Sequence, residues 1–506
     1  VAALAIRWLM HPSDRISAGD QRLHRVADGV FFYRGYFSNS CVLELPEGLV
    51  VVDTQVSPIG ARHLREEIAA VSSKPIVLVV NTHYHGDHTG GNAVFDGIET
   101  IGSELTARYC HERDEERVQY ANTFGLAFQE VHPTLAPTRT FRDRLELNIA
   151  GDTIVIAQIG ASETPDCSVV WWPRRRIVCA GDGVATIDYP FLGVPFMDEG
   201  LRPDGDWIRF LTTIRDWKPE ILLPGHGPAI VSEAAIRSRL DLLVELFTSL
   251  MDATKRAMAK QLAVDAIVAE VDRDLARYRE HPELAAVIVS QRFAIYRCIN
   301  NLSHGRAGKG WWNDLRPSIV ARAPRASVEG WAREAKSTDA IVGRSRALVK
   351  GKRRDAAIAL LECWIESHDR DARALAELAD TLFDGAAGVR PKVDATEFFA
   401  EATKVVHRAI AIDGDEPLAN LVLGCAEVFG GMVLSQPMQA GVAKIERALK
   451  SPTLTSRQRT KGLFFLAKAH QHEHRDSEAD ASFRAMLPAW LRWSFPLLRA
   501  RLRRLP

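Results

Sequence analysis

A six-residue segment in the first half of the chain brings together side chains that commonly bind metal ions. It reads His83-Tyr-His-Gly-Asp-His88 and follows an apolar, β-branched stretch, residues 75–80, that predicts a buried strand. A strand end carries side chains to the place where a rigid sheet meets a loop, which suits a fixed site. His83 and His85 are two positions apart, so an extended backbone points both the same way. Gly86 then permits a tight turn before Asp87 and His88.

Four potential ligands in so short a segment favour two metal ions over one. A single tetrahedral ion does not accommodate all four donors comfortably. Two adjacent ions resolve this, with His83 and His85 on one ion and Asp87 and His88 on the other. Paired sites of this kind hold their ions about 3.5–4 Å apart. A solvated loop with satisfied histidines would suit a lone histidine, but it does not explain this spacing directly after a strand.

Composition sets wide limits on the class of protein. Lys and Arg together number 64, as do Asp and Glu, so the net charge is zero and nothing favours a nucleic-acid partner. The seven cysteines are widely spaced without a CxxC pair, which argues against a zinc finger and a disulfide framework. No stretch is long and apolar enough for a transmembrane segment. We expect a soluble protein, and the sequence leaves open whether it is cytoplasmic or periplasmic.

The pattern of elements changes along the chain. The first part alternates strands and helices, which favours an α/β sandwich with helices outside. The strands are expected at residues 29–33, 40–45, 49–53, 75–80, 145–149, 153–159, 168–172 and 177–179, with a helix at 61–71. From about residue 232 apolar residues follow helical spacing. Helices are expected at residues 340–350, 354–366, 372–383, 397–411, 416–429, 437–450 and 456–470. Helix pairs of about 34 residues are typical of tetratricopeptide repeats, which these units resemble loosely.

Three further segments extend the metal motif into a resemblance to the metallo-β-lactamase superfamily, whose motif is His-x-His-x-Asp-His. Cys179-Ala-Gly-Asp182 is similar to the strand-end Gly-Asp whose carboxylate bridges the two metals. Leu223-Pro-Gly-His226 is similar to the later Pro-Gly-His that completes the second metal site, and Asp53 matches a structural strand-end aspartate. The resemblance covers residues 25–230 and implies an αββα sandwich that binds two zinc ions.

One departure from the family pattern points to a branch. The family usually has a ligand histidine in Gly-His-Thr-Pro-Gly-His, where this chain reads Gly160-Ala-Ser-Glu-Thr-Pro-Asp-Cys-Ser168. Glu163 stands at the ligand position, as in the alkylsulfatase branch, whereas Cys167 and Asp166 are competing candidates for the same role. A carboxylate there would make the first metal a weaker Lewis acid.

The same branch accounts for the helical region. Residues 311–312 and 344–377 are similar to the start of the helical dimerisation domain of the alkylsulfatases. The resemblance therefore implies a homodimer formed through the helical region. We expect a catalytic domain at residues 1–231, a helical alkylsulfatase-type dimerisation domain at 232–385, and a C-terminal helical repeat-like region at 386–506.

The resemblance implies a metal-bound hydroxide that attacks an ester-like bond, as in an alkylsulfatase. His83, His85 and Glu163 would bind one metal. Asp87, His88 and His226 would bind the other, with Asp182 bridging and Asp87 and Asp182 as the catalytic residues. Alkylsulfatases hold sulfate with polar and basic residues after the bridging carboxylate, but residues 183–197 contain no Arg, Lys, Asn or His.

The apolar character of residues 183–197 leaves the substrate open. Tyr189, Phe191 and Phe196 are candidates for an apolar wall around a small-molecule substrate with an apolar group, or for an ordinary core or lid. The alternative function is hydrolysis of a β-lactam or lactone ring by the same metals. A third reading is a degenerate metal domain that presents a helical binding array and has no activity.

Overall fold

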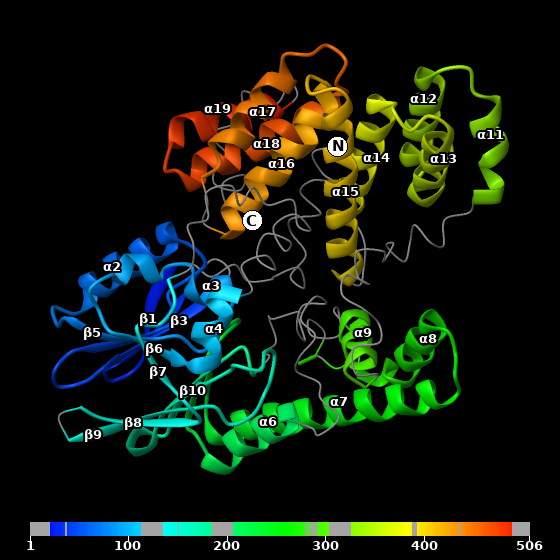
Figure 1. The fold of residues 1–506 in the computed structure, drawn as a ribbon. Coiled ribbons are helices and arrows are strands. Elements are labelled where there is room, and N and C mark those ends of the chain that lie inside the picture. The colour runs from blue at the N-terminus through cyan, green and yellow to red at the C-terminus, as the bar shows by residue number, and fades with distance from the viewer. Residues whose placement is uncertain are drawn as a thin grey trace. The chain divides into compact units, whose positions relative to one another are not determined.

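The computed structural model describes residues 21–35, 38–112, 135–149, 151–184, 206–278, 281, 283–284, 291–302, 325–386, 392–434 and 437–487. These residues form two compact units, shown in Figure 1. The N-terminal unit contains the described residues up to 302, and the C-terminal unit contains those from 325. The domain boundaries expected at residues 232 and 385 remain predictions.

Two β-sheets form the centre of the N-terminal unit. In the first sheet the strands follow sequence order: β1 (Arg22–Ala27), β2 (Val30–Arg34), β3 (Asn39–Glu44), β4 (Leu49–Val52), β5 (Ile76–Val80), β6 (Thr100–Ser103) and β7 (Arg139–Phe141). The second sheet has the order β13 (Ile230–Val231), β12 (Ile221–Pro224), β11 (Ile177–Gly181), β10 (Val169–Trp172), β9 (Asp152–Ala157) and β8 (Arg144–Ile149). The β4–β5 and β11–β12 pairs are parallel, and each places strand ends at the site described below.

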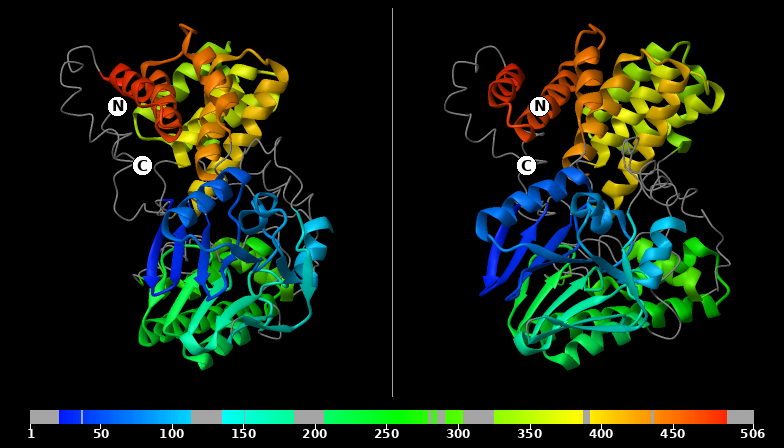
Figure 2. Two further views of the ribbon diagram at one scale, coloured as in Figure 1. Left: turned by 90° about the vertical axis from the view of Figure 1, so that its left-hand side faces the viewer. Right: turned by 60° about the vertical axis from the view of Figure 1, so that its left-hand side comes forward.

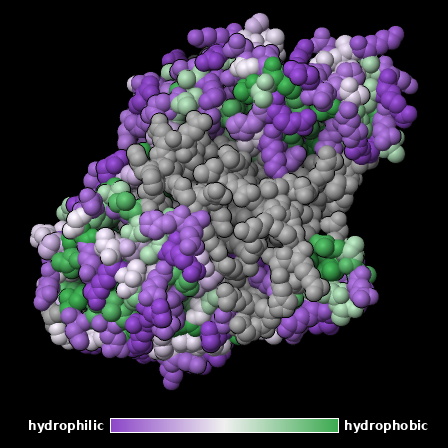
Figure 3. Space-filling model, in the orientation of Figure 1, coloured by the Kyte–Doolittle hydropathy of each residue, from purple (hydrophilic) through white to green (hydrophobic). Residues whose placement is uncertain are grey.

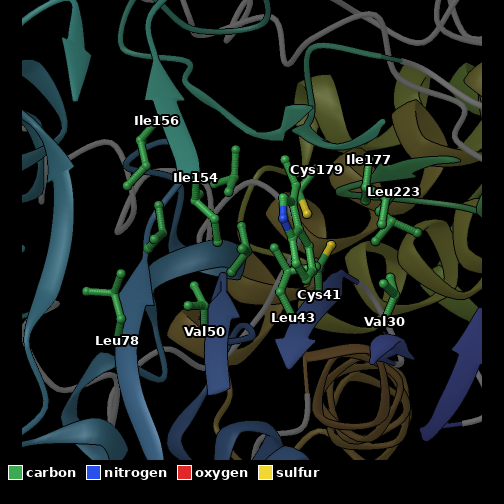
Figure 4. Close-up of a cluster of buried hydrophobic side chains, with 14 of the residues drawn as sticks. Val30, Cys41, Leu43, Val50, Leu78, Ile154, Ile156, Ile177, Cys179 and Leu223 are labelled. Atoms are coloured by element: carbon green, nitrogen blue, oxygen red, sulfur yellow. The ribbon is translucent and has the colours of Figure 1, made fainter. Parts of the chain in front are cut away.

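The two sheets pack face to face around one apolar core (Figure 2). Val30, Leu43 and Val50 of the first sheet meet Ile156 and Cys179 of the second in Figure 4. All of the β4 side chains are buried, because this strand lies between the opposite sheet and a helix. The core therefore fixes the edge of the sandwich from which the predicted ligands project.

Helices cover the outer faces of the sandwich. Helix α2 (Pro58–Val71) packs Ala61, Leu64 and Ile68 on the first sheet, and Ser57 caps its N-terminus by accepting a hydrogen bond from the Gly60 amide. The second sheet is covered by α6 (Asp206–Trp217) and α7 (Glu233–Ala259), drawn in green in Figure 1. This αββα arrangement confirms the predicted fold class. The unit also contains α3 (Gly86–Thr89), α4 (Glu104–Glu112), α8 (Val264–Asp274) and α9 (Gln291–Leu302).

The C-terminal unit is helical, as predicted. It consists of α11 (Glu329–Glu334), α12 (Thr338–Lys350), α13 (Arg354–Ser367), α14 (Ala372–Ala386), α15 (Lys392–Ile412), α16 (Pro417–Leu434), α17 (Gln439–Leu449), α18 (Ser456–His472) and α19 (Asp476–Met486). Each helix from α12 packs on the next, and α12, α14, α16 and α18 also pack in a row. This pattern is that of stacked helix pairs. The residues 311–312 of the predicted dimerisation motif lie outside the described residues.

Most of the described surface visible in Figure 3 is hydrophilic, with apolar side chains scattered over it. The exposed large apolar side chains are also dispersed along the described sequence, from Ile59 to Phe429. Single exposed apolar side chains are normal on a protein surface. Among the helices in the described parts of the chain, none has the length and apolarity needed to cross a membrane.

Candidate metal centre

The metal motif lies where β5 ends. His83 and His85 follow this strand directly, and His85 precedes the short helix α3, which carries Asp87 and His88. Asn81 and Asn92 hold the two ends of the motif together, with hydrogen bonds of 3.1 Å and 2.8 Å between their side-chain amides. The three motif histidines are buried. The turn thus presents its ligand-type side chains from a backbone that is tied down at both ends.

Two sets of side chains converge around this turn. We call His83, His85, Glu163 and Asp182 the first donor group, and Asp87, His88, Asp182 and His226 the second donor group. Within each group the potential ligand atoms all lie within 4.8 Å of one another. The two groups together contain all seven side chains predicted as metal ligands. Their role as ligands remains a prediction, but the structure does bring them together.

Each donor group takes half of its members from each sheet. The His83–His88 turn follows β5 of the first sheet. Glu163 lies between β9 and β10, Asp182 follows β11, and His226 follows β12, all in the second sheet. A chain segment of over 130 residues thus separates the first ligand from the last, and only the packing of the two sheets unites them.

The distances place Asp182 between the two groups. Its Oδ2 atom lies 3.7 Å from His83 Nε2 and 3.2 Å from His226 Nε2, and its Oδ1 atom lies 3.2 Å from His88 Nε2. Asp87 Oδ2 lies 3.0 Å from His226 Nε2 and 3.3 Å from His88 Nε2. In the first group, His85 Nδ1 lies 3.9 Å from Glu163 Oε2. A carboxylate facing both groups is the arrangement that a bridging ligand requires.

The unsatisfied atoms of the site fit divalent cations. His83 Nε2, His88 Nε2 and both carboxylate oxygens of Asp182 are buried and have no hydrogen-bond partner among the described residues. Leaving such atoms unpaired costs about 1–3 kcal/mol each, and more when they are charged. Imidazole nitrogens and carboxylate oxygens are accepted zinc ligands, so cations at the two groups would satisfy these atoms together.

Comparison with known proteins agrees with this geometry. Residues 33–226 match the family model described as the metallo-beta-lactamase superfamily. The N-terminal unit is a metallo-beta-lactamase superfamily domain. The matched segment begins in β2 and ends at His226, so it contains every predicted metal ligand.

Proteins with sequence similarity to this chain include an alkylsulfatase. The linear primary-alkylsulfatase of Pseudomonas sp. (strain ATCC 19151) is 26% identical over 264 residues, which are 46% of this chain and 49% of that protein. The metallo-beta-lactamase type 2 of Elizabethkingia meningoseptica is 22% identical over 236 residues, 44% of this chain and 85% of that protein. This chain therefore spans about half the length of the alkylsulfatase.

A solved structure extends the likeness beyond the metallo-beta-lactamase superfamily domain. The sec-alkylsulfatase Pisa1 from Pseudomonas sp. aligns with a TM-score of 0.54 and 16% identity, covering 76% of this chain and 65% of that one. At this identity the match shows a shared fold. Because it covers 76% of this chain, the similarity reaches past the domain into the helical region.

Asp53 orients one of the histidines of the superfamily domain. Its Oδ2 atom lies 2.8 Å from His88 Nδ1 and accepts a hydrogen bond from Thr82 Oγ1 at 2.8 Å, while Oδ1 accepts one from the Thr82 amide at 2.8 Å. A carboxylate behind a histidine fixes which ring nitrogen faces a metal. Here it leaves Nε2 of His88 for the second donor group, which agrees with the structural role that the resemblance implies for Asp53.

The pKa values describe a site with excess negative charge. Burial lowers the pKa of His88, but the carboxylates of Asp182, Asp87 and Asp53 outweigh it and raise the pKa well above its usual range. Burial also lowers the pKa of His226, but the carboxylates of Asp182 and Asp87 outweigh this effect and raise the pKa to about 10. In the absence of cations, protons on these two histidines would therefore balance the carboxylates.

Zinc loading of the metal-free protein is expected to release protons near neutral pH. Because their pKa values are raised, His88 and His226 carry protons at pH 7 until a metal replaces them. We expect at least two protons per chain, one for each of these histidines. Zinc affinity should fall as the pH is lowered, since protons compete for the same nitrogens. Calorimetric titration in buffers of different ionisation enthalpy measures the released protons, and a value near zero would contradict the prediction.

The structure separates the three candidates for the first-metal carboxylate position. Glu163 belongs to the first donor group, whereas Asp166 and Cys167 belong to neither group. Asp166 Oδ2 accepts hydrogen bonds from the Tyr84 amide and Thr106 Oγ1, and Cys167 Sγ lies 3.2 Å from Thr164 Oγ1. The substrate-wall candidates Tyr189, Phe191 and Phe196 lie outside the described residues.

Arg297 is a residue of the site that the sequence analysis did not single out. It lies on α9, is 1% exposed, and donates a hydrogen bond to the backbone carbonyl of Glu163. Burial and the charge of Asp182 raise the pKa of Glu163, and the guanidinium of Arg297 opposes this effect. An available signal was that Arg297 sits on the apolar face of its helix, next to the buried Cys298.

Proposed function

We propose that this chain is a metal-dependent hydrolase that binds two zinc ions and cleaves an ester-like bond, namely the sulfate ester of an alkyl group. The observation that carries the proposal is the pair of buried donor groups joined through Asp182. Each group offers two imidazole and two carboxylate ligands, a set that suits zinc. Glu163 in the first group is the feature shared with the alkylsulfatase pattern.

The proposed roles of the residues follow from the two groups. His83, His85 and Glu163 hold the first ion, Asp87, His88 and His226 hold the second, and Asp182 bridges them. When bound, a pair of divalent ions lowers the pKa of a water and polarises the bond that is cleaved.

Asp87 differs from the other donors in its exposure. Its side chain is 15% exposed, whereas that of His85 is 7% exposed and that of Asp182 is 1% exposed. Of these three side chains, that of Asp87 is therefore the most accessible to water. Its carboxylate can accept a hydrogen bond from the attacking water and orient it, in addition to binding the second ion.

Arg297 supports a substrate with a negative charge. Two bound dications would attract an anionic group directly. The buried guanidinium of Arg297 beside Glu163 offsets one of the carboxylates around them. A monoanionic sulfate ester complements such a site better than a neutral ester does. Arg297 thus offers the basic group that residues 183–197 lack.

Hydrolysis of a β-lactam or lactone ring is the alternative, favoured by the match to a metallo-beta-lactamase. A substrate panel of dodecyl sulfate, p-nitrophenyl esters and nitrocefin distinguishes the two functions on the zinc-loaded chain. We expect turnover of dodecyl sulfate to dominate. Turnover of nitrocefin alone would make the sulfatase proposal wrong. If the protein still contained no metal after zinc was added, the non-enzymatic binding array would be favoured instead.

Removing the Arg297 charge is expected to change the substrate preference. In Arg297→Met the loss of the positive charge beside Glu163 is expected to lower kcat/KM for the anionic dodecyl sulfate roughly 10- to 100-fold relative to that for the neutral p-nitrophenyl acetate, which corresponds to about 1.5–3 kcal/mol. The matched control is Arg239→Met, because Arg239 is also a buried arginine of this unit but donates to the Glu283 carbonyl. The control should leave the ratio unchanged. An equal ratio in both variants would remove Arg297 from the proposal.

Dimerisation through the helical region and an apolar group on the substrate are further parts of the proposal. The likeness to alkylsulfatases supports both. The apolar segment 183–197 supports the second.

A further inference from the structure

Asp166 is a buried carboxylate beside the first donor group that binds no predicted metal. It is 0% exposed, three positions after Glu163 in the loop between β9 and β10. Its Oδ2 atom accepts a hydrogen bond from the Tyr84 amide at 2.8 Å and another from Thr106 Oγ1 at 2.9 Å. Because Tyr84 lies between His83 and His85, this carboxylate is anchored to the peptide link between the two histidine ligands of the first group.

A carboxylate is a costly choice for this place. The Asp166 Oδ1 atom is buried and has no hydrogen-bond partner among the described residues. An unpaired buried charge is tolerated when an opposite charge lies nearby. A cation bound by His83 and His85 would supply that charge.

We propose that Asp166 is a positioning residue for the first metal. It ties the backbone that carries His83 and His85 to the loop that carries Glu163, and its charge favours a cation in the first donor group. This inference rests on the proposed two-metal function. In this role Asp166 contacts the backbone that carries the ligands and does not bind the metal itself, which was the alternative that the sequence left open.

The second donor group has a different anchor, which provides the comparison. Asn39 donates from Nδ2 to the carbonyls of Pro224 at 3.1 Å and Gly227 at 2.9 Å, and from its amide to Gly225 at 2.7 Å. These three residues surround His226. Asn39 is also buried. In each donor group one ligand-bearing segment is therefore braced by a polar side chain from the opposite sheet: Asp166 holds the His83–His85 segment, and Asn39 holds the segment around His226. The two braces are separable by mutation.

The test measures stepwise metal binding to the metal-free chain. Zinc binding is monitored by calorimetry, and cobalt(II) binding is monitored by visible absorption. Glu163→Gln identifies the binding step of the first group, and His226→Asn identifies that of the second. Asp166→Asn is expected to weaken the Glu163-dependent step by about 10- to 100-fold and to shift its cobalt absorption, leaving the other step unchanged. Asn39→Ala is expected to weaken the His226-dependent step instead.

Two outcomes would overturn the proposal. One is unchanged metal binding by Asp166→Asn, and the other is an equal loss at both steps, which a general structural role would produce. If Asp166→Asn fails to fold, Thr106→Val decides, because it removes one of the hydrogen bonds to Asp166 while the Tyr84 amide keeps the other; it also removes the contact between Thr106 Oγ1 and Ser103 Oγ. It should weaken the Glu163-dependent step less strongly, and unchanged binding would overturn the proposal. Failure of the proposed function differs from these outcomes, since the unmodified chain would then bind no metal, or would bind it without cleaving dodecyl sulfate.

Discussion

Asp182→Asn is expected to lose hydrolytic activity and to bind fewer than two metal ions per chain. Asp182 faces His83, His88 and His226 and is the one member common to both donor groups. An amide offers one neutral oxygen where the carboxylate offers two charged ones. The loss of several kcal/mol of metal-dependent stabilisation corresponds to a decrease in kcat/KM on the order of 10³-fold or more. Elemental analysis and dodecyl sulfate assays measure both effects.

Asp152→Asn is the matched control for this variant. Asp152 is a buried aspartate of the same unit, but it pairs with Arg174 at 2.6 Å on the β8–β9 side, outside both donor groups. Its metal content and activity should equal those of the unmodified chain. Full activity in Asp182→Asn would contradict the bridging role, whereas a similar loss in both variants would indicate general damage to the fold.

Lys461→Met is expected to destabilise the C-terminal unit strongly. Lys461 on α18 is 10% exposed in its side chain, donates to Asp380, and lies 2.9 Å from Asp384 Oδ1, both on α14. Burial lowers the pKa of Lys461, but the two carboxylates raise it by more than burial lowers it. The pKa is therefore above its usual range, and the lysine is charged. Its removal leaves two carboxylates buried without their main partner.

The expected cost is about 3–5 kcal/mol of unfolding free energy, the range for breaking a buried ion pair. This lowers the thermal midpoint of the unit by roughly 10 °C. Scanning calorimetry of the full chain measures the shift. The matched control is Arg447→Met, in the same unit, whose side chain is 64% exposed and lies 3.8 Å from the exposed Asp415. Equal midpoints for the two variants would show that the buried cluster contributes little.

The sequence predicts much of the sandwich, because most of its strands are apolar and separated by turns. Residues 49–53 and 75–80 are examples, found as β4 and β5. The short strands β6 and β12 escaped prediction, since four residues with a Gly or Pro carry little periodic signal. Helices such as α13 and α18 were predicted within a few residues, because each repeats apolar positions at helical spacing.

The site was predictable to different depths. His83 to His88 form a local motif that chemistry alone explains, whereas Glu163, Asp182 and His226 required the resemblance to a family. Their convergence depends on sheet packing, which no local pattern encodes. Arg297 and the Asp166–Tyr84 contact were missed because hydrogen bonds between residues over 80 positions apart leave no trace in spacing. The charges of Lys461 and Asp380 similarly resemble a solvated helix face until both helices are placed.

The origin of the ligands in two different sheets has a consequence for the cohesion of the domain. His83 and His85 belong to one layer, and Asp182 and His226 belong to the other. Each ion would therefore join the two halves of the sandwich, as a crosslink does, and the free energy of binding would add to the attraction between the layers. If the chain binds zinc as proposed, it would resist heat or proteolysis according to the supply of free zinc around it, and metal starvation would shorten its lifetime as well as stop its chemistry.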